Sequence, residues 1–147
     1  MATPKIEMAQ LKLIRSLFAC NINFRPSEER LTIGVTMKHN GEFLDEYSRA
    51  HFLQRFHTEE SPNVPFTIDV EFGALFLIDP PIMPLERDHY IRRVFPEIVF
   101  PYMREYVAET TRRGGFSPLI INHTLFEDID DPDTTATYEP DLNKWIH

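Results

Sequence analysis

The residues that could carry chemistry in this sequence are few, and their spacing does not bring them together. His51 and His57 share one face of an expected strand, but six residues at about 3.3 Å each separate them by about 20 Å, so one metal ion cannot bind both within that strand. Cys20 is the single cysteine, and its place on an apolar line of a strand predicts a small buried hydrophobe rather than a nucleophile. The sequence has no phosphate-binding glycine loop, no Gly-x-Ser-x-Gly elbow and no His-Glu-x-x-His zinc helix.

A group of carboxylates near the C-terminus is the best candidate for a metal site. Asp128, Asp130, Asp131 and Asp133 lie close to His123, but the spacing lacks the glycine and the terminal glutamate of a calcium loop. A solvated acidic tail is the simpler interpretation. We therefore predict no catalytic residue, no metal site and no cofactor. A small metal-dependent enzyme that uses these residues stays as an alternative, although catalytic groups usually converge in a walled pocket.

Composition narrows the class of protein. The 147 residues suffice for one domain with a core, and a net charge of −8 disfavours a nucleic-acid partner while it allows an unfolded or basic polypeptide. One cysteine permits no internal disulfide, which fits a reducing compartment. The N-terminus lacks a signal-peptide pattern, and no apolar run is long enough to insert into a membrane. We expect a cytoplasmic protein.

The elements that must position any site are strands first and a helix afterwards. Residues 11–24 are apolar on both sides, which is typical of a strand between layers or in a subunit contact. Residues 31–38 and 46–57 alternate between apolar and polar, with a hairpin turn predicted at Asn40-Gly41 between them. Residues 66–78 place every even position on one apolar face, so four successive strands indicate an antiparallel sheet.

A helical period follows over residues 85–113. Pro96 and Pro101 should kink this helix, and Gly114 and Gly115 should end it. The sequence predicts an α+β fold: a four-stranded antiparallel sheet with a crossover segment, followed by a long kinked helix packed on one face. We expect a single domain over residues 1–126 and an acidic, proline-broken C-terminal tail over residues 127–147.

Three segments carry a resemblance to a known family. Residues 72–76 read Phe-Gly-Ala-Leu-Phe, residues 96–105 read Pro-Glu-Ile-Val-Phe-Pro-Tyr-Met-Arg-Glu, and residues 113–119 read Arg-Gly-Gly-Phe-Ser-Pro-Leu. In order and spacing they resemble the hallmark segments of SecB, the bacterial protein-export chaperone. With the plan of sheet then helix, the resemblance extends over residues 11–126.

The resemblance implies a homotetramer, built as a dimer of dimers, that binds unfolded precursor polypeptides without ATP and passes them to the SecA motor. It implies a client-binding groove at the crossover strand and an aromatic on the opposite wall; the matching residues are Leu31, Ile33, Val35, Met37 and Phe126. The even positions of the strand expected over residues 66–78 form a larger apolar surface than one kinked helix can easily cover, which predicts an oligomer interface. Its expected residues are Ile68, Val70, Phe72, Tyr102 and Tyr106.

Contact with SecA is expected on the outer face of the sheet. Asp69 matches an acidic SecA-contacting position of the family, and Glu71 lies beside it on the same face. Two other acidic positions of the family correspond to Asn21 and Arg25 here. Some SecB-like proteins serve antitoxins, so a chaperone dedicated to one client, such as an antitoxin, is the alternative to a general export holdase.

Overall fold

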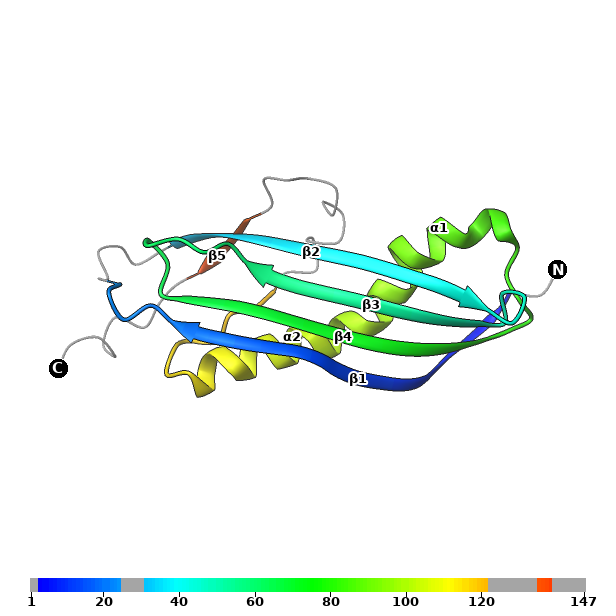
Figure 1. The fold of residues 1–147 in the computed structure, drawn as a ribbon, viewed down its shortest axis with the longest axis horizontal. Coiled ribbons are helices and arrows are strands. Elements are labelled where there is room, and N and C mark those ends of the chain that lie inside the picture. The colour runs from blue at the N-terminus through cyan, green and yellow to red at the C-terminus, as the bar shows by residue number, and fades with distance from the viewer. Residues whose placement is uncertain (1–2, 25–30, 122–134, 139–147) are drawn as a thin grey trace.

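The computed structural model describes residues 3–24, 31–121 and 135–138 and shows an antiparallel sheet with one long helix packed across one face (Figure 1). The strands are β1 (Lys5–Cys20), β2 (Leu31–Leu44), β3 (Arg49–Thr58), β4 (Phe66–Asp79) and β5 (Thr135–Tyr138), in the order β1-β4-β3-β2-β5. The four-stranded antiparallel sheet and the α+β class are confirmed. The short strand β5 is an addition, because residues 135–138 were expected in an irregular tail and instead pair with β2.

The alternation of side chains explains the inner face. In β4 every even residue from Phe66 to Ile78 is buried, while the odd residues are half-buried or exposed. Ala50, Phe52 and Phe56 of β3 are buried on the same side. Both faces of these strands therefore follow the period of two that the sequence predicts.

The turn between β2 and β3 lies further along the chain than expected. β2 runs through Asn40-Gly41 to Leu44, and the chain reverses at Asp45, Glu46 and Tyr47, all with positive φ. Gly41 is needed for packing instead, because a Cβ there would come within 2.9 Å of the Ile91 side chain. The prediction of a turn at Asn40-Gly41 is wrong for this reason: a turn signal and a close approach both select glycine.

The helical segment begins at Pro84 and is continuous to Arg113. It comprises a 3-10 turn η1 (Pro84–Glu86), a short α1 (Arg87–His89), a π turn η2 (Tyr90–Val94) and α2 (Phe95–Arg113). The N–H of Phe95 donates to the carbonyl of Tyr90, five residues back. Pro96 cannot donate a backbone hydrogen bond, and a kink was predicted there. The structure has the π turn directly before this proline.

Helix α2 packs one stripe of side chains against the sheet. This stripe includes the buried residues Val99, Met103, Val107 and Thr111, whereas Tyr102 on the neighbouring stripe is 47% exposed. Thr111 Oγ1 donates to the carbonyl of Val107 and accepts the N–H of Leu119, which ties the segment after the helix to its last turn.

Strand β1 is an edge strand with two irregularities in its register with β4, at Met8/Gln10 and at Leu13/Arg15. The second irregularity places Ile14 beside Gly73 on the outer face, whereas Phe18 and Cys20 pair with Ile68 and Phe66 of the inner face. Cys20 is exposed, which contradicts the expectation of a buried side chain. Among the described residues, no helix is long and apolar enough to cross a membrane.

Candidate functional site

The residues predicted to line a client groove lie on the inner face of β2. Ile33, Val35 and Met37 are 0%, 3% and 6% exposed and belong to the core, and Leu31 is half-buried. Phe126, predicted on the opposite wall, lies outside the described residues. In this conformation the four β2 positions form a covered apolar surface rather than an open groove.

The cover at the end of this surface is β5. Leu31 pairs with Tyr138 and Gly34 pairs with Thr135, so β5 uses the edge of β2 that β3 leaves free. Tyr138 is buried, its hydroxyl donates to the carbonyl of Ser117 at 2.8 Å, and its ring meets Phe66 edge-on at 5.2 Å between centroids. An extended segment of the chain thus occupies an apolar strand edge through backbone pairing and one aromatic anchor.

The inner face of β2 continues to His39. Its ring stacks on Phe52 at 5.7 Å between centroids, and burial lowers the pKa of His39 to about 4. The imidazole is therefore neutral at pH 7 and leaves the inner face uncharged. The unfolded chain binds this proton more readily than the folded chain does. His39 therefore lowers the free energy of unfolding as the pH falls from its ordinary pKa of about 6.5 towards its folded pKa of about 4.

The outer face holds Asp69 and Glu71, the expected SecA contacts. Arg55 of β3 donates two hydrogen bonds to Asp69, from Nε to Oδ1 at 2.8 Å and from Nη2 to Oδ2 at 2.6 Å. Nη1 of Arg15 in β1 lies 3.5 Å from the same Oδ2. The Arg55 hydrogen bond holds the pKa of Asp69 below its usual value. Glu71 pairs in register with both arginines. The two carboxylates are thus balanced by two guanidinium groups, and the site is not an acidic patch.

Removing the Asp69 carboxylate tests this arrangement. Asp69→Asn should lower the free energy of unfolding by about 1–2 kcal/mol at pH 7, because a charge-assisted bidentate contact is lost. The folded pKa of Asp69 is depressed, so this stability is present above the unfolded pKa of about 3.9 and is lost as the pH falls through the folded value. Urea denaturation at several pH values measures it.

The matched control for this experiment is Asp45→Asn, which breaks an exposed pair with Arg49. It should change stability little at any pH. Equal destabilisation by Asp69→Asn at pH 3 and pH 7 would contradict the ion-pair explanation.

The predicted oligomer residues divide into two groups. Ile68, Val70 and Phe72 are covered by the chain's own structure under α2, so one helix does cover this face and these three side chains are not available to a partner. Tyr102 is exposed, and Tyr106 shares a 2.7 Å hydrogen bond with Ser16 of β1. The interface prediction therefore depends on the two tyrosines.

The candidate metal ligands predicted near the C-terminus cannot be compared with the structure. His123 and the carboxylates of residues 128–133 lie outside the described residues. Within the described part of the chain, no group of three His, Cys, Asp or Glu side chains could hold a metal ion.

Comparison with known proteins gives the family. Residues 22–131 match the family model described as preprotein translocase subunit SecB. The chain belongs to the SecB family. The match includes all of β2, β3, β4 and α2, with the inner face of β2 and the Arg55–Asp69 pair, and it begins after β1 has ended.

Curated relatives in the SecB family are moderately similar. The chain is 31% identical over 97 residues to the protein-export protein SecB of Orientia tsutsugamushi strain Ikeda, which covers 60% of this chain and 58% of that protein. It is 26% identical over 106 residues to the protein of the same name from Mesorhizobium japonicum, covering 69% and 51%. The chain spans about half the length of the curated relatives that it matches.

Two solved structures share the fold. A Mycobacterium tuberculosis SecB-like chaperone in complex with a peptide from the HigA1 antitoxin superposes with a TM-score of 0.65 at 21% identity, covering 80% of this chain and 88% of that one. A Streptococcus agalactiae protein of unknown function gives 0.57 at 10% identity, covering 82% and 99%. At these identities the likeness shows the fold alone.

Proposed function

We propose that this chain is a subunit of a cytoplasmic holding chaperone that binds unfolded precursor polypeptides and delivers them for export, without ATP and without catalytic activity. The observation that carries the proposal is the match to the SecB family over residues 22–131. The apolar edge of β2, covered at one end by a four-residue strand, supports the same function.

The geometry of β2 supports the proposed binding of a client. This strand has 14 residues, and β5 pairs with only four of them, from Leu31 to Gly34. Along the rest of that edge, no other strand among the described residues pairs with it. An extended client that displaces β5 can pair with a longer stretch of β2, and Leu31, Ile33 and Val35 then supply apolar contacts. Exchange of one strand for another needs no nucleotide.

A dedicated client, such as an antitoxin, is the second candidate. The Mycobacterium tuberculosis SecB-like chaperone of this fold is in complex with an antitoxin peptide. Here Asn21 replaces an expected acidic SecA contact, and its side-chain amide donates to the carbonyls of Pro62 and Val64. Because Arg55 and Arg15 also neutralise Asp69, we propose that any SecA contact at Asp69 and Glu71 is weak.

Co-purification from cells separates the two candidates. The tagged full chain is recovered under gentle conditions, and bound polypeptides are identified by mass spectrometry. Many precursor proteins would support the general export holdase, and one antitoxin would support the dedicated chaperone. If neither the wild type nor a variant with weakened β5 pairing recovers any polypeptide, both candidate functions would be contradicted.

We also propose that the chain forms a homotetramer, a dimer of dimers. Strand β1 is 16 residues long and, among the described strands, pairs only with β4, so its other edge is open. Leu13 and Leu17 are 45% and 50% exposed along it, which is an aggregation hazard unless a partner covers them. Light scattering at micromolar concentration should give four times the chain mass. A monomeric mass would contradict the assembly.

A further inference from the structure

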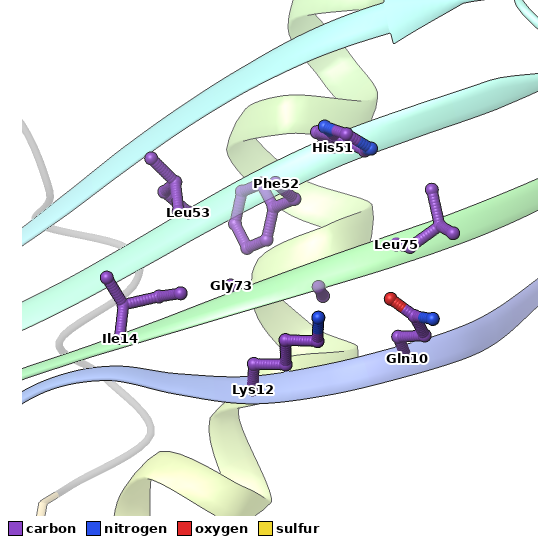
Figure 2. Close-up of a pocket in the computed structure, with 9 residues that line it drawn as sticks. Gln10, Lys12, Ile14, His51, Phe52, Leu53, Gly73 and Leu75 are labelled. Atoms are coloured by element: carbon purple, nitrogen blue, oxygen red, sulfur yellow. The ribbon is translucent and has the colours of Figure 1, made fainter.

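The outer face of the sheet contains a shallow hollow that the proposed client site does not use. Its volume is about 240 Å³, and its walls come from β1, β3 and β4 (Figure 2). Lys12 and Ile14 line it from β1, Leu53 from β3, and Gly73 forms its floor on β4. We call it the Gly73 hollow. It opens on the side of the sheet opposite to α2.

The sequence creates this hollow by two local features. Lys12, Gly73 and Leu53 form one cross-strand row, and Gly73 adds no side chain of its own between the other two. Ile14 lies at the register irregularity of β1, and a Cβ on Gly73 would lie 3.1 Å from its Cδ1 and 3.4 Å from Cδ2 of Leu53. The rim is therefore apolar on both sides of the glycine.

The hollow is part of an apolar patch that faces water. Ile14 is 54% exposed and Leu53 is 37% exposed, and the patch continues along β4 through half-buried Leu75 to Leu77, which is 37% exposed. The outer face of an antiparallel sheet that only meets water is usually polar, so contiguous exposed leucines indicate an interaction surface. The hollow is smaller than the roughly 300–1,000 Å³ of small-molecule sites, which favours one anchoring side chain of a peptide.

The charge around the hollow differs from that of the whole chain. The outer face of the four long strands has six cations and five carboxylates, whereas the chain as a whole has a net charge of −8. These are Lys5, Lys12, Arg15, Lys38, Arg49 and Arg55, and Glu7, Glu42, Asp69, Glu71 and Asp79. Asp69 and Glu71 face the two arginines of β1 and β3, and Glu42 faces His51. Lys12 makes no ion pair with another described residue, so its ammonium is free to donate hydrogen bonds to a carboxylate of a partner.

We propose that the Gly73 hollow docks an acidic, apolar peptide segment of a partner protein. An apolar side chain of the partner packs into the hollow against Ile14 and Leu53, and a neighbouring carboxylate of the same segment pairs with the Lys12 ammonium. The site is distinct from the client edge, because the hollow lies across β1, β4 and β3, whereas the client edge is the side of β2 that faces β5.

Binding of a matched pair of labelled peptides tests the proposal. The probes are fluorescein-labelled Glu-Leu-Glu-Phe-Glu and the same peptide with each Glu replaced by Lys, titrated with the full chain and followed by anisotropy. The acidic peptide should bind about tenfold more tightly than the basic one, and Lys12→Glu should lower its affinity by about tenfold. Lys38→Glu, an equal charge reversal on β2, should leave that affinity within about twofold.

A second variant and a second readout keep the site separate from the client edge. Gly73→Val fills the hollow and should also reduce binding of the acidic peptide, with folding checked by circular dichroism. Suppression of client aggregation should be the same in Lys12→Glu as in the wild type. Equal affinity for the two peptides, or unchanged affinity in Lys12→Glu, would overturn the proposal whatever the outcome for client holding.

Discussion

Replacing Phe95 with alanine should lower the free energy of unfolding by about 3–5 kcal/mol, the range for deleting a buried phenylalanine side chain. Phe95 is fully buried at the start of α2, directly after the π turn. Its ring stacks on Phe76 of β4 at 4.3 Å with an interplanar angle of 7°, and it also contacts Phe52 of β3 and Phe43 of β2. One side chain therefore joins the helix to three strands, and its loss leaves a cavity that rigid rings cannot fill.

Urea denaturation followed by circular dichroism measures this effect. Leu85→Ala is the matched control, because Leu85 is 97% exposed in the turn before the helix and its loss should change stability by less than about 0.5 kcal/mol. A loss below 1 kcal/mol for Phe95→Ala would show that α2 is not held to the sheet through this ring.

Weakening β5 should increase affinity for an unfolded client by about tenfold. In the proposed mechanism β5 must leave β2 before a client can pair there, so the measured affinity is proportional to the fraction of chains in which β5 is released. Tyr138→Ala removes the ring contact with Phe66 and the hydrogen bond to Ser117. A loss of about 1.4 kcal/mol of β5 binding corresponds to a factor of ten in this fraction.

Anisotropy titration of a labelled, permanently unfolded polypeptide measures the change. Tyr138→Phe is the matched control, since it keeps the ring and loses only the hydroxyl, and it should raise the affinity less than Tyr138→Ala does. A lower affinity in Tyr138→Ala would mean that Tyr138 belongs to the client site and does not compete with it.

The fold was predictable from the sequence wherever one physical rule dominated. Period-two alternation placed the buried face of β4 correctly, because a strand between a helix and water has only two faces. The helix was located by its period, but the sequence did not separate the buried stripe of Val99 and Met103 from the exposed Tyr102 beside it, since adjacent apolar stripes differ by only one residue. Asn40-Gly41 misled because Gly41 serves packing under Ile91.

The candidate site was predictable only in part, because its other parts come from distant segments. Alternation placed Leu31, Ile33, Val35 and Met37 on one face of β2, yet no local signal showed that Thr135–Tyr138 would pair with that strand. The prediction that Asp69 lies on the outer face was also correct. Its partner Arg55 lies 14 residues earlier, and only the register of β3 with β4 brings the two together.

The central claim, ATP-independent holding of unfolded polypeptides, is tested most directly by aggregation of an unfolded client. A model client is diluted from denaturant into buffer with increasing amounts of the full chain, with and without ATP and magnesium, and light scattering is followed. For a nucleotide-independent holdase, we expect scattering to fall in proportion to the added chain and the two curves to coincide. Undiminished scattering at a molar excess of the chain, or suppression only with ATP, would contradict it.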